Sequence, residues 1–112
     1  MALKEQVVDG VAILALKGKL LGGNETEELH DKLRQLQQSD INKIVLDLRQ
    51  VKRLNSSGLA ALMVAKAGLR NAGGDLKLAN VEGEVHSLFM ITKLITIFET
   101  FSSVDRALKS FK

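Results

Sequence analysis

The sequence contains no cysteine, tryptophan, tyrosine or proline. Without cysteine the chain has no disulfide, no Cys-ligated zinc or iron–sulfur site and no thiol nucleophile. The absence of cysteine also fits a reducing compartment. Only four phenylalanines are available to stack on nucleic-acid bases, so binding of single strands through aromatic side chains is poorly supported.

Long hydrophobic runs are missing as well. No apolar stretch approaches the roughly 20 residues that span a bilayer, and the N-terminal residues lack the apolar segment of a signal peptide. The 16 basic and 13 acidic residues are interspersed, and the longest basic run is the pair Lys52 and Arg53. We therefore expect a cytoplasmic protein that binds neither membranes nor nucleic acid directly, although the net charge is +3.

The residues that are present fit one small folded domain. The chain has 112 residues, of which 46% are hydrophobic and 26% charged, so we expect one core and a single domain over residues 1–112. It opens with a short mixed segment, residues 3–8, and an apolar segment, residues 11–17, separated by Asp9 and Gly10. An Asp-Gly pair between apolar segments predicts a tight antiparallel hairpin, because both turn positions need a positive φ. The second strand is predicted to be largely buried.

The remainder alternates between helices and strands. After a loop at residues 18–23, Asn24 is predicted to cap a helix that ends near Ser39. Its apolar side chains recur at helical spacing as Leu29, Leu33 and Leu36. Strands are predicted at residues 43–48, 75–79 and 95–101, and helices at residues 57–72, after residues 81–84 as far as Thr92, and after Ser103. This order predicts an α/β fold, a small mixed sheet with an antiparallel opening hairpin, then parallel strands, covered by helices.

The segment between residue 48 and the second helix has the best position for a functional site. Sites in α/β sheets form where a strand ends and a helix begins. Ser56, Ser57 and Gly58 stand there, and Ser56 is predicted to cap the helix while its hydroxyl faces solvent. A phosphate on this hydroxyl would lie near free backbone N–H groups and add about −1.5 to −2 charges to the surface. An ordinary helix cap is the alternative.

The helix after this segment has no charge in its first stretch, residues 58–65. Its predicted buried side consists of Ala61, Leu62, Ala65 and Leu69. Leu59 and Met63 then fall partly on the other side, with Ala60 and Ala67. A helix that is apolar on both sides is either covered on both sides or offers a docking surface. The sequence leaves both alternatives open.

Other groups that carry chemistry are few. Lys17, Lys19, Lys52 and Arg53 are predicted to gather near Ser56 if the second and third strands are neighbours, and would then attract an acidic partner, a phosphate or a nucleotide. Scattered solvated lysines are the alternative. Neither His30 nor His86 belongs to a nucleophile–base pair or a metal-ligand spacing, and no GxxxxGK[ST] loop occurs. We therefore expect no enzyme activity, no metal and no cofactor.

Residues 43–62 resemble the signature of STAS domains, and most closely that of the bacterial anti-sigma factor antagonists. The resemblance is carried by the apolar strand at residues 44–48, by Val51, and by the run Leu54, Asn55, Ser56, Ser57, Gly58 and Leu59. It extends over nearly the whole chain, through residues 18–20, 75–81 and 98–108. It implies a STAS-like fold.

The resemblance also implies a mechanism. In that family the antagonist binds an anti-sigma factor, itself a serine kinase, and so frees the sigma factor. The kinase phosphorylates the serine after the acidic residue of an Asp-Ser-Ser/Thr-Gly motif, the phosphorylated antagonist releases the kinase, and a serine phosphatase resets it. Here the phosphoacceptor would be Ser56. The motif and partner-binding residues would be Asn55, Ser57, Gly58, Leu59 and Met63, on a monomer or weak dimer.

Two positions depart from the family pattern. Asn55 stands where the family has the acidic residue before the serine, and Leu20 and Leu21 stand where an Asp often follows the glycine near the end of the second strand. Both carboxylates are therefore missing. Three functions stay open: an antagonist switched by phosphorylation, a constitutive protein-interaction module in another signalling assembly, and a STAS module that binds a nucleotide or small anion.

Overall fold

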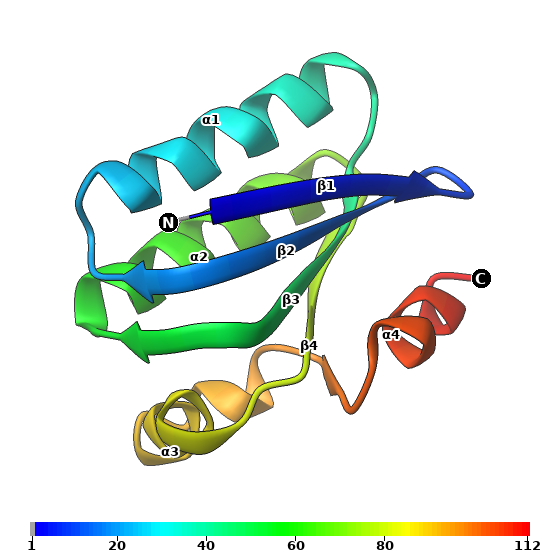
Figure 1. Ribbon diagram of the computed structural model, residues 1–112. Coiled ribbons are helices and arrows are strands. Elements are labelled where there is room, and N and C mark those ends of the chain that lie inside the picture. The colour runs from blue at the N-terminus through cyan, green and yellow to red at the C-terminus, as the bar shows by residue number, and fades with distance from the viewer. Residues whose placement is uncertain (1) are drawn as a thin grey trace.

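The computed structural model describes residues 2–112 as a five-stranded sheet with helices on both faces (Figure 1). The strands are β1 (Ala2–Val8), β2 (Val11–Leu20), β3 (Lys43–Leu54), β4 (Asp75–Ala79) and β5 (Thr100–Phe101). The helices are α1 (Asn24–Gln38), α2 (Ser56–Asn71), α3 (Gly83–Ile91) and α4 (Val104–Ser110), with a 3-10 turn, η1, at Leu94–Thr96. Within the order β1-β2-β3-β4-β5, β1 and β2 are antiparallel and the other pairs are parallel. The predicted mixed α/β fold is confirmed.

The opening hairpin forms where the sequence places it. Asp9 and Gly10 adopt φ values of 53° and 78°, and Val8 pairs with Val11 across the turn. Positive φ at both turn positions matches the right-handed twist of the two strands. The first part of β2, residues 11–14, is buried on both faces of the sheet, as the sequence predicts.

The next two strands run further than the sequence predicts. A loop is expected from residue 18 and a strand end at residue 48, but β2 and β3 stay paired as far as Leu20 and Leu54. That prediction is wrong because two register shifts insert extra residues into β3. Leu48 and Val51 are both buried although they are three residues apart, which breaks the alternation that marks a strand in sequence. The consequence is that α2 begins directly at the end of β3.

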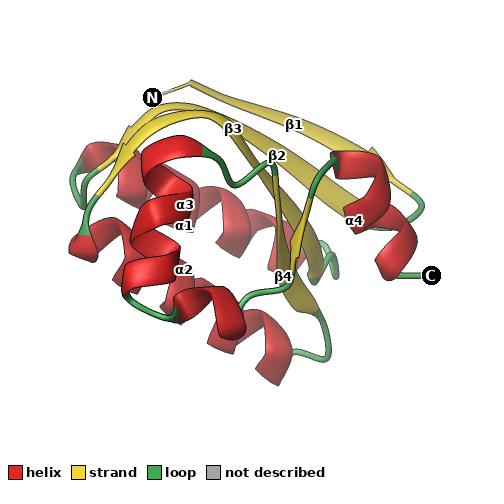
Figure 2. Ribbon diagram, turned by 90° about the horizontal axis from the view of Figure 1, so that it is seen from below, coloured by secondary structure: helices red, strands yellow, loops and turns green. Residues whose placement is uncertain are grey.

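The helices are divided unequally between the two faces of the sheet. Figure 2 shows α1, α2 and α3 on one face and α4 on the other. The larger core lies under the first three helices and includes Leu14, Leu46, Leu62 and Phe89, each fully buried. Each such side chain contributes about 1.5–3 kcal/mol. The smaller core, under α4, consists of Val11, Ile13, Val45, Ala79 and Ala107.

Two local predictions need correction. The N-cap of α1 is Gly23 and not Asn24, and the cap has no side-chain hydrogen bond. Instead the Gly22 N–H donates to the Thr26 hydroxyl at 2.9 Å. A residue inside the first turn of the helix therefore supplies the hydrogen-bond acceptor for a backbone N–H of the preceding loop. The strand expected over residues 95–101 is mostly η1 and coil, and only Thr100–Phe101 pairs with β4. The predicted Ser103 cap of α4 is confirmed, because its hydroxyl accepts the Arg106 N–H at 3.2 Å.

A buried ion pair fixes α2 against β4. The Lys66 ammonium is 2.7 Å from the Asp75 carboxylate and also donates to the Leu76 carbonyl, and the Lys66 residue is only 6% exposed. Burial alone raises the pKa of Asp75, but hydrogen bonds from Lys66 and the Leu76 N–H, with the charges of Lys66 and Arg70, bring the pKa below its ordinary value of 3.8. The carboxylate form is therefore favoured in the folded state.

This ion pair predicts acid sensitivity. A lowered folded-state pKa gives stability that is present above 3.8 and is lost as the pH falls through the folded value. Urea unfolding of the wild type and of Asp75→Asn is the measurement. The variant should be less stable near pH 7, and the difference between the two free energies should shrink as the pH falls below 3.8. A constant difference over that range would contradict the assignment.

Candidate functional site

Ser56 is the first residue of α2, separated from the end of β3 only by Asn55, and it is exposed. It does not cap the helix, which corrects the sequence prediction. The cap is Asn55, whose side-chain oxygen accepts the Gly58 N–H at 2.9 Å. Because the cap is supplied by its neighbour, the Ser56 hydroxyl forms no hydrogen bond within residues 2–112. The exposed hydroxyl that the sequence predicts is present, one position further into the helix than expected.

Asn55 joins two segments that are far apart in the sequence. Besides accepting from Gly58, its side-chain amide donates to the Leu21 carbonyl at 3.1 Å. These two partners fix the orientation of the amide, because one needs an acceptor and the other a donor. A carboxylate at this position accepts the same N–H but has no proton for the Leu21 carbonyl. The asparagine is therefore structurally suited to this loop, although it brings no charge to Ser56.

Gly58 allows α2 to begin against the end of β2. A Cβ at this position would overlap the Leu20 carbonyl oxygen and lie 2.6 Å from the Leu54 Cδ1. The overlap with the backbone cannot be relieved by a side-chain rotation. Gly58 therefore determines how closely the first turn of α2, which carries Ser56, approaches the sheet.

Gly58→Ala is expected to destabilise the domain by about 2 kcal/mol, because overpacking outweighs the gain in helix propensity. Gly68→Ala is the matched control, since Gly68 lies in the same helix and a Cβ there meets nothing within 4 Å. The control should be stabilised by about 0.5–1 kcal/mol. Denaturant unfolding of both variants measures this, and a neutral or stabilising Gly58→Ala would contradict the close approach.

Part of the exposed side of α2 forms one continuous stripe, which we call the α2 stripe: Ser56, Ala60, Met63, Ala67 and Arg70. Val64, which is 65% exposed, lies next to this stripe. Its members follow at spacings of four and three residues, which places them on one helical face about 21 Å long. Met63 is 41% exposed, as the sequence predicts for a docking residue. Leu59 is not on this face. It is 4% exposed and belongs to the main core, which contradicts the exposure that the sequence predicts for it.

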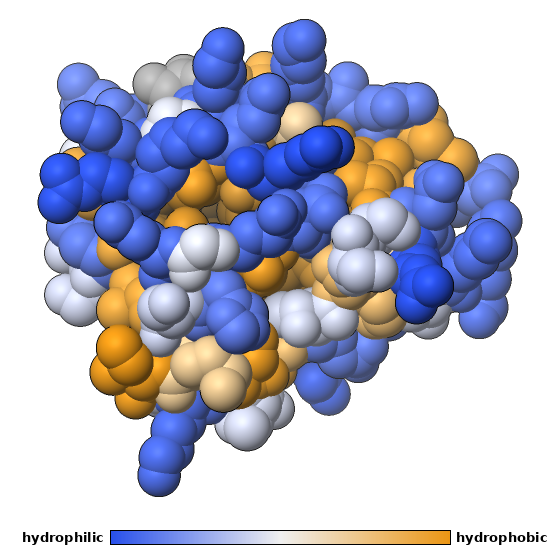
Figure 3. Space-filling model, turned by 60° about the horizontal axis from the view of Figure 1, so that its bottom comes forward, coloured by the Kyte–Doolittle hydropathy of each residue, from blue (hydrophilic) through white to orange (hydrophobic). Residues whose placement is uncertain are grey.

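Apolar residues beyond α2 extend the stripe. A groove of about 260 Å³ is lined by Met63, Lys66, Ala67, Arg70 and Ile97. Met90 and Ile91, at the end of α3, are 52% and 80% exposed. Figure 3 shows hydrophobic residues gathered at the lower left of the molecule, over α3 and the segment after it. The sequence reasoning missed this part, although the apolar run at residues 88–91 could have indicated it.

The basic residues predicted near Ser56 come partly together. β2 and β3 are neighbours, and their register pairs Lys19 with Arg53 and Lys17 with Gln50. Lys52 is one of the extra residues of β3. All four basic side chains are exposed at the end of the sheet from which α2 starts.

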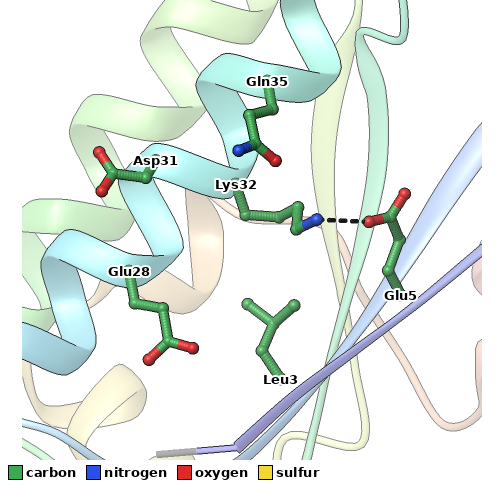
Figure 4. Close-up of a pocket in the computed structure, with 6 residues that line it drawn as sticks. All are labelled: Leu3, Glu5, Glu28, Asp31, Lys32 and Gln35. Carbon is green, nitrogen blue, oxygen red and sulfur yellow. Dashed lines mark hydrogen bonds and ion pairs between the residues drawn. The ribbon is translucent and has the colours of Figure 1, made fainter.

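Other hollows carry no recognisable chemistry. A hollow of about 310 Å³ lies between β1 and α1, and in it Lys32 pairs with Glu5 at 2.7 Å while Glu28, Asp31 and Gln35 also line it (Figure 4). His30 is half-buried in a groove between α1 and α2, and His86 is exposed on α3. Within residues 2–112 no group of three or more His, Cys, Asp or Glu could hold a metal ion, and no helix is long and apolar enough to cross a membrane.

A comparison with protein families decides the classification. The family model described as "STAS domain" matches residues 2–107. The chain belongs to the STAS domain family. Ser56 therefore lies at the exposed start of a helix in a STAS domain. It follows the Asn55 cap and is the first residue of the α2 stripe.

Individual STAS proteins resemble the chain over their whole length. The anti-sigma factor antagonist BtrV of Bordetella bronchiseptica is 29% identical over 112 residues, covering 100% of this chain and 96% of the relative. An anti-sigma factor antagonist of Thermotoga maritima has a TM-score of 0.84 at 23% identity, covering 96% of this chain and 92% of the other. SpoIIAA of Bacillus, solved in its phosphorylated form, has a TM-score of 0.77 at 17% identity, covering 99% and 100%. At these identities the two structures establish the fold alone.

Proposed function

We propose that this STAS domain is an anti-sigma factor antagonist. It binds an anti-sigma factor that is a serine kinase, through the α2 stripe, and thereby frees a sigma factor in the cytoplasm. Phosphorylation of Ser56 by the bound kinase weakens the complex, and a serine phosphatase restores binding. The observation that carries the proposal is the exposed Ser56 hydroxyl at the head of a stripe whose next three residues, Ala60, Met63 and Ala67, are uncharged.

The switch follows from where a phosphate would lie. The first N–H groups of a helix have no partner within the helix, and the Asn55 side chain satisfies that of Gly58 while its carbonyl accepts that of Leu59. A phosphate on Ser56 is therefore stabilised locally by the remaining N–H groups and the helix dipole. The same phosphate adds about −1.5 to −2 charges at the end of the α2 stripe whose next residues, Ala60, Met63 and Ala67, are uncharged, and desolvating it there opposes binding. The domain stays folded while its docking surface changes.

The relatives support this proposal. BtrV, at 29% identity, and the Thermotoga protein are described as anti-sigma factor antagonists. SpoIIAA, with the same fold, exists in a phosphorylated form. A domain of this kind acts by binding, so the proposal requires no catalytic residue on this chain.

Incubation with the anti-sigma factor kinase of the same organism and ATP tests the proposal. Intact-mass measurement should show the addition of one phosphate group, and Ser56→Ala should abolish it. Ser57→Ala is the matched control, because it removes the neighbouring exposed hydroxyl and should leave the modification in place. A modification that survives Ser56→Ala would overturn the assignment of the phosphoacceptor.

A constitutive interaction module is the second candidate. Asn55 favours it, because the amide places no carboxylate beside Ser56 to orient a kinase. The mass measurement separates the two functions. A chain that binds its partner tightly but gains no phosphate from it would be a constitutive module.

A further inference from the structure

α4 covers only one half of its face of the sheet. The side chains under it are Val11, Ile13, Val45 and Ala79, which lie toward the hairpin end of β2 and the start of β3. In Figures 1 and 2 the other half of this face, toward the ends of β2 and β3, carries no helix. This uncovered half faces away from α1, α2 and α3, and it is therefore separate from the α2 stripe.

The uncovered half is basic. Side chains alternate between the faces of a strand, so Lys17 and Lys19 lie on the same face as Val11 and Ile13. The register adds Arg53 beside Lys19 on β3, and Lys4 beside Ala15 on β1. All four are exposed. We call Lys4, Lys17, Lys19 and Arg53 the basic sheet face.

These cations have no ionic partner among residues 2–112. Other basic residues are paired: Lys32 with Glu5, Lys66 with Asp75, and Lys77 with Glu99. The acidic residue nearest the basic sheet face in the register is Asp47, which is half-buried and accepts from the Asn80 amide at 2.9 Å and the Arg49 N–H at 3.1 Å. Four unpaired like charges on a small area repel one another unless a partner neutralises them.

We propose that the basic sheet face binds an extended acidic segment of a partner protein. Residues two apart on an extended strand are about 6.6 Å apart and neighbouring strands about 4.8 Å apart, so Lys17, Lys19 and Arg53 follow one another at about 5–7 Å. Lys4, opposite Ala15, lies diagonally about 8 Å from Lys17. An extended segment with a carboxylate at every second residue presents charges at the same spacing. β1 is also an edge strand, whose outer backbone groups can pair with such a segment.

The arrangement favours this occupant over other anions. A single small anion engages one or two cations, whereas these four are spread over three strands. Single-stranded nucleic acid is bound mainly through aromatic platforms, and the basic sheet face contains no aromatic residue. The surface thus offers cationic side chains and the unpaired backbone groups of β1. An acidic polypeptide can form ion pairs and backbone hydrogen bonds with them, whereas a nucleic-acid base has no aromatic side chain to stack on.

The test uses a short fluorescent peptide with Glu at every second position and Ser between. Fluorescence anisotropy should detect binding at about 0.05 M salt that weakens toward about 0.3 M, because exposed charges are screened. The triple variant Lys17→Glu, Lys19→Glu, Arg53→Glu should weaken binding by at least about tenfold. The matched control, Lys43→Glu, Lys93→Glu, Arg106→Glu, reverses two lysines and an arginine that are exposed elsewhere and should change affinity by less than about twofold.

Several results would overturn the proposal. Equal losses in the two triple variants would mean that binding follows net charge and not this face. Tighter binding of an oligothymidylate of equal charge would identify a nucleic-acid surface. Self-association at low salt that the first triple variant abolishes would identify a second copy as the occupant. If the peptide does not bind at all, the basic sheet face does not bind an acidic segment. Circular dichroism of all variants confirms that each remains folded.

Discussion

Ser56→Asp is expected to weaken binding to the anti-sigma factor kinase by about 100-fold or more while the domain remains folded. A single unpaired charge enclosed in an interface costs about 3–5 kcal/mol, and each 1.4 kcal/mol is a factor of ten in affinity. The fold is unaffected because a carboxylate in the first turn of a helix is favourable. Ser56 is exposed, so no core side chain has to move.

Isothermal titration calorimetry with the kinase, together with thermal unfolding of the free domain, measures both parts of this prediction. Ser102→Asp is the matched control: Ser102 is exposed just before α4, on the opposite side of the sheet from α2. The control should bind like the wild type. Unchanged affinity of Ser56→Asp would place Ser56 outside the interface.

Leu59→Asp should destabilise the fold, whereas Met63→Asp should mainly weaken kinase binding, although the two residues are only four positions apart on one helix. Leu59 is 4% exposed in the main core, so an aspartate there buries an unpaired charge and costs several kcal/mol of a total stability of about 5–15 kcal/mol. The domain should unfold or lose at least about 15 °C in Tm. Met63 is 41% exposed, and Met63→Asp should change Tm by only a few degrees and weaken kinase binding at least about tenfold.

Thermal unfolding followed by calorimetry distinguishes the two sites. A folded Leu59→Asp that merely loses affinity would return Leu59 to the docking surface, as the sequence alone suggests. A Met63→Asp that unfolds would mean that the α2 stripe is part of the core. Either outcome would remove the structural basis of the proposed interface.

The fold could be predicted wherever local signals and burial agree. Asp9 and Gly10 identify the hairpin, and residues 75–79 form β4 with the predicted limits. The spacing of Leu29, Leu33 and Leu36 identifies the buried face of α1, and all three are in the core. These features depend on turn conformation and on the period of apolar residues, both of which are encoded within a few neighbouring residues.

The wrong predictions lie where contacts between residues distant in the sequence determine the limits of strands and helices. β3 extends to Leu54 because β2 pairs with it through two register shifts, which the alternation of residues 49–54 does not reveal. Residues 95–101 have strand-like composition, yet only two of them pair with β4. The N-cap of α2 is Asn55 and not the predicted Ser56, because the Asn55 amide is also held by a hydrogen bond to the Leu21 carbonyl, in a loop 34 residues away.

The site was predictable in position and less so in detail. Ser56 and Met63 are exposed as the sequence predicts, because both follow from the location of the helix start. Leu59 is buried because α2 starts close to β2 over Gly58, and that approach turns its side chain into the core. Helical spacing alone cannot predict the burial of Leu59, since spacing determines which residues share a face of the helix but not which face packs against the sheet.

The most direct test compares the kinase affinity of the unmodified domain with that of the domain phosphorylated on Ser56, by titration calorimetry on the same preparation. We predict that the unmodified form binds tightly and that the phosphorylated form binds at least about 100-fold more weakly, since the added phosphate brings about two negative charges to the α2 stripe. Equal affinities of the two forms would contradict a switch at Ser56.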